Sequence, residues 1–210
     1  MKKTNSKTPT TRIQRQKRLV ILEAALEVFS KHGFRGSTLD QIASEAGISK
    51  PNILYYYASK QEMHKELIER MMDKWLAPLE EMNAKGDPIA EISAYIKRKL
   101  EMARDYPRQS RLFNNEILQG APHIIDLLEG ELKILVDEKA KVIANWMKKG
   151  RLTKTDPYHL IFSIWATTQH YADFDVQVCA VLGEKSAINH RFKVAQKHLD
   201  LLFVRALEVE

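Results

Sequence analysis

Polar side chains between residues 50 and 56 have the types and spacing needed to contact a nucleic acid. Lys50 and Asn52 stand at the start of a predicted short helix, and Tyr55 and Tyr56 follow about one turn later. Amide and ammonium groups reach base edges in a DNA groove, and ammonium and hydroxyl groups also bind phosphate oxygens. The alternative is a polar helix face that meets only water. The helices that carry these residues distinguish the two possibilities.

Residues 38–57 have the pattern of two short helices joined by a tight turn. Thr38 and Gln41 form a predicted capping box at the start of the first helix, and Gly47 supplies the positive φ that ends it. Four apolar residues at helical spacing give this helix one buried face: Leu39, Ile42, Ala43 and Ala46. The pattern predicts a helix-turn-helix.

The second helix of the pair begins at Ser49, a predicted N-cap, with Pro51 in its first turn, where a missing N–H is tolerated. The side chains expected to face inward are Ile53, Leu54 and Tyr57. The second helix of such a motif enters the major groove. The side chains expected to reach base edges there are Lys50, Asn52 and Tyr55.

Positive charge is concentrated at the same end of the chain. The 210 residues carry a net charge of +6. Residues 1–65 contain twelve Lys and Arg against five acidic residues, a local net charge of +7, which leaves −1 for the remainder. A basic end beside a helix-turn-helix is typical of contact with phosphates. We expect residues 1–11 to be a disordered basic tail and residues 12–58 to be the DNA-binding domain.

A second candidate site combines Trp75 with Trp165 and Gln169, which lie one helical turn apart later in the chain. If the three side chains converge, two indole rings and an amide can bind a flat heterocycle by stacking and paired hydrogen bonds. Tryptophans at helical spacing more often belong to an apolar core. The residues alone leave this alternative open.

The other reactive residue types form no catalytic or metal-binding pattern. The seven histidines are scattered, and a single cysteine, Cys179, excludes an internal disulfide. His170 and Asp173 lie one turn apart, a spacing more typical of a structural pair. We therefore predict that the chain is not an enzyme and carries no metal or cofactor. With one cysteine and no apolar run of membrane length, it is expected to be cytoplasmic, without membrane contact.

The rest of the chain is predicted to be helical, giving an all-α fold of about nine helices, with residues 59–210 as a helical effector-binding and dimerisation domain. A capping box at residues 59–62 opens the fourth helix, and Pro78 is expected to kink or end it. Residues 83–88 are the clear linker. The remaining helices are expected at 12–31, 88–106, from 107 to the break at 120–122, from that break to 149, 156–182 and 186–209.

Residues 29–63, FSKHGFRGSTLDQIASEAGISKPNILYYYASKQEM, resemble the N-terminal domain of the TetR family of transcriptional regulators. The resemblance implies that the protein reads double-stranded operator DNA as a homodimer, formed through its last two helices. Thr38, Tyr56 and Lys60 are expected to contact phosphates, a role that the resemblance favours for Lys60, and Ser49 and Pro51 are counted among the DNA-binding residues. Pro51 and Tyr57 depart from the usual family pattern, and Pro51 leaves the exact base contacts open.

Four later segments resemble the pyrimidine-utilisation regulators of that family: WLAPL (75–79), ARDYPRQSRLF (103–113), LKILVDEKAKVIANWMKKGRL (132–152) and DPYHLIFSIWATTQHYADF (156–174). This resemblance implies that uracil or thymine releases the protein from DNA. Carried over by position, the effector contacts are Trp75, Trp165, Gln169 and Tyr171. Asn114 and Asn115 are more polar than the pattern, and Asn115 is added as a candidate contact that would shift the ligand preference.

Two alternatives remain at this point. One is a regulator of the same family that answers to a different heterocycle or to a hydrophobic molecule. The other is a basic helical module that binds a protein or an acidic lipid surface. Salt-sensitive, sequence-selective binding to duplex DNA would distinguish a regulator from such a module.

Overall fold

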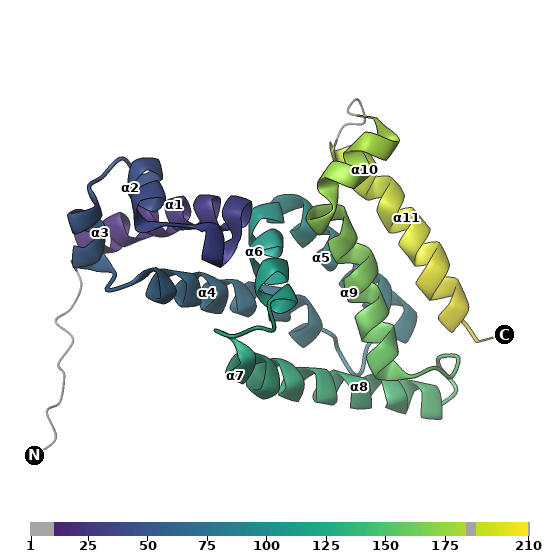
Figure 1. Ribbon diagram of the computed structural model, residues 1–210. Helices are drawn as coiled ribbons and strands as arrows, with labels where there is room; N and C mark the ends of the chain where they lie inside the picture. The colour runs from purple at the N-terminus through teal and green to yellow at the C-terminus, as the bar shows by residue number, and fades with distance from the viewer. Residues whose placement is uncertain (1–10, 184–187, 210) are drawn as a thin grey trace, which may run out of the picture. The chain divides into compact units, whose positions relative to one another are not determined.

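The computed structural model describes residues 11–183 and 188–209, and within these ranges the chain is helical and contains no strand (Figure 1). The all-α prediction is confirmed. The expected tail lies outside the described residues except for Thr11, whose side chain caps the first helix. No helix in the described part is long and apolar enough to cross a membrane.

The chain divides into two compact units, one up to Leu67 and one from Ile68 onward. The division falls inside the helix α4 (Lys60–Glu80), later than the border after residue 58 that we expected. The first turns of α4 belong with the N-terminal unit because Met63 and His64 are buried there, and His64 packs against the ring of Phe29 at 5.3 Å.

The N-terminal unit contains α1 (Arg12–Gly36), α2 (Leu39–Ala46), α3 (Lys50–Tyr56) and the start of α4. Helix α1 was expected to end at residue 31 but continues to Gly36. Gly33 has φ 67° and ψ 171°, so it kinks the helix, and one further turn follows before Ser37. The core of the unit is apolar, and its most deeply buried members are Ile21, Phe29, Ile42, Ile53, Tyr57 and Met63.

The predicted turn between α2 and α3 is largely confirmed. The Thr38–Gln41 capping box is present, and Gly47 caps α2 with φ 64°. Two expectations for α3 are wrong. Ser49 occupies the N-cap but its side chain makes no capping hydrogen bond. Leu54 is 45% exposed, because α3 has only seven residues and Ile53 and Tyr57 already fill the core beneath it.

The C-terminal unit is arranged around α5 (Pro88–Asp105), which packs against α6 (Pro107–Leu118), α9 (Pro157–Asp173) and α11 (Ile188–Leu207). Asp87 caps α5 by accepting from the Ala90 N–H at 2.9 Å. Along α5 the buried residues recur at helical spacing, which gives one continuous inward face, and they include Ile92, Tyr95, Ile96, Lys99, Leu100 and Ala103.

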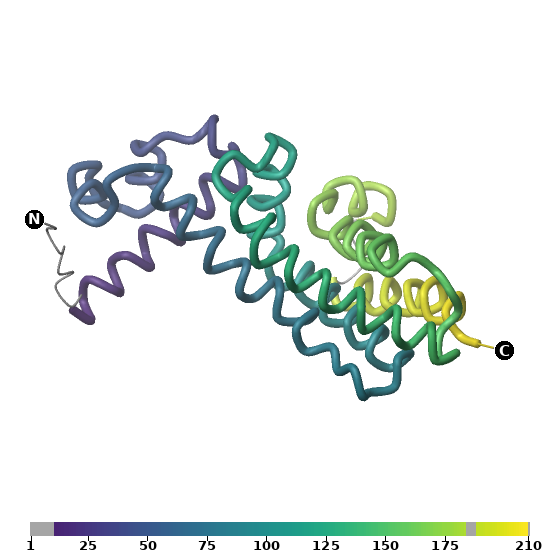
Figure 2. The backbone as a smooth tube through the Cα atoms, turned by 90° about the horizontal axis from the view of Figure 1, so that it is seen from below, coloured from purple at the N-terminus to yellow at the C-terminus, as the bar shows by residue number. Residues whose placement is uncertain are grey.

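The segment before residue 149 is more interrupted than the single helix we expected. It consists of α7 (Ile125–Leu127), a π-helical stretch η1 (Leu128–Leu132) and α8 (Lys133–Lys148). Figure 2 shows α8, in green, running beside the connection 81–87 between α4 and α5. Lys139 Nζ donates to the Glu80 carbonyl at 2.9 Å, and Trp146 Nε1 donates to the Ala84 carbonyl at 3.0 Å. These donors satisfy carbonyls at the end of α4 and beyond it. Pro78, which was expected to kink or end the helix, lies inside α4, and the helix ends two residues later at Glu80.

The helix expected at 156–182 is two helices, α9 and α10 (Asp175–Leu182), separated at Phe174. Phe174 has φ −113° and ψ 30°, outside the helical region, and its ring stacks on His170 at 5.0 Å. Neither glycine nor proline marks this break, so the sequence pattern could not reveal it. The described part of the last helix begins at Ile188, and its expected start at Ser186 lies outside the described residues.

Candidate nucleic-acid interface and ligand cavity

The residues predicted to contact DNA lie on the surface of the N-terminal unit. Thr38, at the start of α2, is exposed and so are Ser49, Lys50, Pro51 and Asn52, which begin α3. Tyr55 is 72% exposed, and Tyr56 is half-buried with its ring edge-on to that of Tyr55 at 5.0 Å. Side chains that can donate or accept hydrogen bonds therefore gather at the start of α2 and along α3.

Lys50 is held by a neighbour on the same surface. Its ammonium lies 2.8 Å from the Asp40 carboxylate, and both side chains are largely exposed. An exposed ion pair of this kind contributes little to stability. Lys50 is therefore available to a phosphate or a base edge at small cost.

Lys60 has a more structural position than the sequence indicated. Its ammonium donates to the carbonyls of Phe34 and Ser37, both at 2.6 Å, and lies 4.4 Å above the Phe34 ring. Partial burial lowers the pKa of Lys60. Through its two hydrogen bonds, the Lys60 ammonium links the start of α4 to the end of α1. A lysine has three N–H donors, and the two carbonyls among the described residues occupy two of them.

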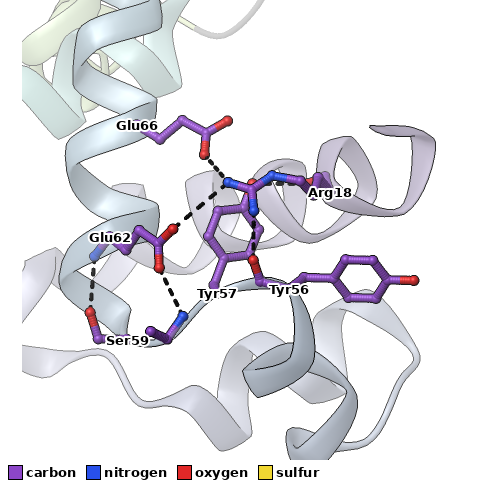
Figure 3. A network of polar contacts seen from close by, with 7 residues as sticks. Arg18, Tyr56, Tyr57, Ser59, Glu62 and Glu66 are labelled. Atoms are coloured by element: carbon purple, nitrogen blue, oxygen red, sulfur yellow. Dashed lines mark hydrogen bonds and ion pairs between the residues drawn. The ribbon is translucent and has the colours of Figure 1, made fainter. Parts of the chain in front are cut away.

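Arg18 anchors the end of α3, and the motif analysis missed it (Figure 3). The guanidinium lies 4.0 Å above the Tyr57 ring and donates to the Tyr56 carbonyl and to Glu66, each at 2.6 Å. Its planar fork satisfies a carbonyl at the C-terminus of α3 while it pairs with α4 and stacks on an aromatic ring. Arg18 therefore joins α1, α3 and α4 at one point.

Glu62 completes this network at the start of α4 (Figure 3). Its backbone N–H donates to Ser59 Oγ at 3.2 Å, as the predicted capping box requires. Its carboxylate, however, accepts from the backbone N–H of Ala58 at 2.8 Å, one residue before the expected partner. The same carboxylate lies 3.9 Å from Arg18. The segment between α3 and α4 is thus fixed from both sides.

In the C-terminal unit, Trp75, Trp165 and Gln169 line one cavity, as the convergence hypothesis requires. The cavity contains about 370 Å³ of space between atoms, a figure that includes open solvent, and only about 40 Å³ of it admits the centre of a water-sized sphere. Its other lining residues are mostly apolar or aromatic: Met72, Leu76, Leu79, Tyr95, Lys99, Phe113 and Leu132.

The two indoles of the cavity differ in their hydrogen bonding. Trp165 Nε1 donates to the Tyr95 hydroxyl at 2.5 Å, whereas Trp75 Nε1 is buried and has no hydrogen-bond partner among the described residues. Burial raises the pKa of Tyr95, so its phenol stays protonated. A buried N–H without an acceptor costs stability, and an acceptor on a bound molecule or a water would remove that cost.

Lys99 is a functional candidate that motif analysis missed. Only 4% of the residue is exposed, and its ammonium lies 5.6 Å from the centre of the Trp75 ring. Burial lowers the pKa of Lys99 to about 8, and the negative charge of Asp173 opposes that shift. A signal was present, because Lys99 interrupts the apolar face that Ile92, Ile96 and Ala103 define on α5.

The remaining candidates lie elsewhere. Tyr171 and Asn115 are half-buried but do not line the cavity, and the Tyr171 ring packs on Phe192 of α11 at 5.9 Å. Asp173 accepts a hydrogen bond from Ser110 Oγ at 2.5 Å, and its partial burial raises its pKa. Neither the packing of Tyr171 on Phe192 nor the hydrogen bond from Ser110 to Asp173 has the features of a catalytic pair.

Comparison with known proteins identifies both units. Residues 21–67 match the family described as bacterial regulatory proteins, tetR family, and residues 68–210 match the C-terminal region of YcdC-like proteins. The HTH-type transcriptional regulator RutR of Escherichia coli K12 is 53% identical over 80% of this chain and 79% of that protein. The HTH-type transcriptional repressor SCO4008 of Streptomyces coelicolor is 36% identical over 65% of this chain and 68% of that protein.

Solved structures agree on the fold. The ketosteroid transcriptional regulator KstR2 of Mycobacterium tuberculosis superposes with a TM-score of 0.69 at 18% identity, covering 92% of this chain and 96% of that one. At this level of identity the likeness concerns the fold alone.

Replacing Arg18 by Lys should lower the free energy of unfolding by about 1 kcal/mol, because an ammonium cannot reproduce the planar fork that contacts the Tyr56 carbonyl and Glu66 together. Urea denaturation followed by circular dichroism measures the change. Arg12→Lys, on an exposed position of the same helix, is the control and should alter stability by less than about 0.5 kcal/mol. Equal effects of the two substitutions would contradict the role assigned to Arg18.

Replacing Lys99 by Met should stabilise the ligand-free protein by up to about 3 kcal/mol at pH 7, because the folded state no longer buries a charge. Folded Lys99 loses its proton near pH 8, whereas the unfolded chain keeps it until about pH 10.5. Wild-type stability should therefore rise relative to the variant across this range, and the difference should close.

Denaturation of both proteins between pH 7 and pH 10.5 measures this convergence. Lys97→Met, at an exposed position on the same helix, is the matched control and should follow the wild type at every pH. A Lys99→Met variant that is less stable than the wild type at pH 7 would contradict the cost assigned to the buried ammonium.

Proposed function

Because the chain belongs to the tetR family of bacterial regulatory proteins, we propose that it senses a pyrimidine, uracil or thymine, and that this effector releases it from operator DNA. The chain is a ligand-responsive DNA-binding transcriptional regulator and not an enzyme. Regulators of this family bind operator DNA and small molecules and act as dimers. The identity of the effector, the residues that contact it and the direction of its effect are the substance of the proposal.

DNA reading is assigned to the exposed side of α2 and α3. Lys50, Asn52 and Tyr55 reach into the groove, and Tyr56 and Thr38 contact phosphates. The exposure of these side chains, described above, supports the assignment. Arg18 acts indirectly, because its bond to the Tyr56 carbonyl fixes the end of the reading helix.

The effector is assigned to the cavity of the C-terminal unit. The observation that carries this assignment is the convergence of Trp75, Trp165 and Gln169 on one cavity, from helices far apart in the sequence. A pyrimidine dione has two flat faces for the indoles and an imide edge that alternates acceptors with a donor. The Gln169 amide offers the complementary donor and acceptor. The resemblance to pyrimidine-utilisation regulators supports the same ligand class.

The dimer is assigned to α9 and α11, which expose apolar side chains that a monomer has no use for. Phe162 on α9 is 46% exposed, and Val194, Leu201 and Leu202 on α11 are 49–53% exposed. Burial of these faces against a second copy would remove them from water. The dimer has two conformations that differ in how well their reading helices fit the two half-sites of the operator. The effector acts by binding one of these conformations more tightly, which increases its population.

A purely hydrophobic effector is the less favoured candidate. The cavity carries a buried ammonium, Lys99, and an unpartnered indole N–H, Trp75. An aliphatic ligand would leave both donors without acceptors, which carries the full penalty of burying them.

Calorimetric titration of the purified protein should show binding of uracil and thymine and at least tenfold weaker binding of cytosine, since about 1.4 kcal/mol from a mismatched hydrogen bond suffices. Gln169→Ala should weaken uracil binding by a similar factor. Gln177→Ala, an exposed glutamine on α10, is the matched control and should bind as the wild type does. Failure of the wild-type protein to bind any pyrimidine would refute the proposed effector.

Replacing Lys60 by Ala should weaken binding to all duplex DNA sequences alike and reduce the slope of log K against log salt by about 0.9, the loss expected for one phosphate contact. Fluorescence anisotropy at a series of salt concentrations measures the slope. Lys97→Ala, in the C-terminal unit, should leave it unchanged. A slope that stays the same in Lys60→Ala would show that Lys60 serves only the two carbonyls it holds.

A further inference from the structure

The cavity contains more hydrogen-bond donors than acceptors. Within residues 11–183 and 188–209, Trp75 Nε1 is buried without a hydrogen-bond partner. Only 4% of Lys99 is exposed. No hydrogen bond joins its ammonium to any of the described residues. The Tyr95 hydroxyl accepts from Trp165 and keeps its own proton. Gln169 offers an acceptor as well as a donor on its side chain.

A buried ammonium without a hydrogen-bond partner is an expensive feature. Transferring such a group from water into apolar surroundings costs several kcal/mol unless a partner compensates it. A methionine or leucine at position 99 would continue the apolar face of α5 without that cost. The charge is therefore explained more readily by a ligand than by folding.

We propose that Lys99 determines the ligand specificity of this cavity by donating to an exocyclic oxygen of a flat dioxo heterocycle. This inference rests on the proposed function and deepens it, because it names the atom type that the site demands. The indole rings select for flatness, and the ammonium selects for oxygen.

The same geometry explains rejection. A ring that carries an amino group in place of the oxygen at Lys99 would set donor against donor, and a cationic ligand would add the repulsion of two positive charges in a poorly solvated site. Discrimination against such molecules comes from an unfavourable contact, and it does not require a better fit for the correct ligand.

Binding of an oxygen acceptor should also draw a proton to Lys99. The charged group that acts on Lys99 is Asp173 of α9, which is itself faced by Arg111 and His170 and bonded to Ser110. Because the pKa of Lys99 is about 8 without ligand, an acceptor that favours the charged form raises it. The complex should therefore take up protons when it forms at pH 8.

The test is calorimetric titration with uracil of the wild type and of Lys99→Met, Lys99→Arg and Lys97→Met. Lys99→Met should weaken uracil binding about 10- to 100-fold, the value of a hydrogen bond to a charged group. Lys97→Met should bind as the wild type does. Titration at pH 8 in two buffers of different ionisation enthalpy should show proton uptake by the wild type and by Lys97→Met, and none by Lys99→Met.

Lys99→Arg keeps a permanent charge, so it should retain more affinity than Lys99→Met while showing no proton uptake. Circular dichroism confirms that each variant is folded. Wild-type binding that Lys99→Met retains in full, with the same proton uptake, overturns this inference and leaves the proposed function standing. Absence of uracil and thymine binding by the wild type overturns the proposed function and this inference together.

Discussion

The burial of the Lys99 ammonium is the constraint on which the C-terminal unit depends. Helix α5 lies in the middle of this unit, and the one charge on its inward face needs groups around it that tolerate a cation. The Trp75 ring on α4 lies 5.6 Å away, and Asp173 on α9 supplies the opposing charge. Ser110 on α6 in turn holds Asp173 in place. Helices far apart in the sequence thus converge on the Lys99 ammonium. The cavity beside it is mostly apolar but contains a cation that needs a hydrogen-bond acceptor.

The N-terminal unit solves a different problem, because its reading helix has only seven residues and cannot hold itself in position. Tyr57 anchors the helix from below, and Arg18 closes over that ring and takes the carbonyl of Tyr56. Lys60 does the same for the kinked end of α1. Both cations satisfy backbone groups at helix ends, so the positive charge of this unit is divided between holding the fold together and presenting a surface to DNA.

The sequence predicted features that depend on neighbours a few residues apart. The capping box of Thr38 and the left-handed Gly47 are local, and both are present. The convergence of Trp75 with Trp165 could be proposed from the residues but not decided by them, because it joins helices ninety residues apart in sequence. Arg18 and Lys99 were missed, since their roles arise from partners that only the folded chain brings near. The break at Phe174 was missed because no glycine or proline marks it, and the stacking of the Phe174 ring on His170 is visible only in the folded chain.

The pairing of Lys50 with Asp40 has a consequence for how the protein moves along DNA. In the proposed interface, a phosphate oxygen would take the place of this carboxylate, so each encounter with a duplex would exchange one anion for another. The displaced carboxylate would then stand close to the DNA backbone and repel it. Such a competitor would weaken binding slightly at random sites, where charge alone holds the protein, whereas base contacts compensate for it at the operator.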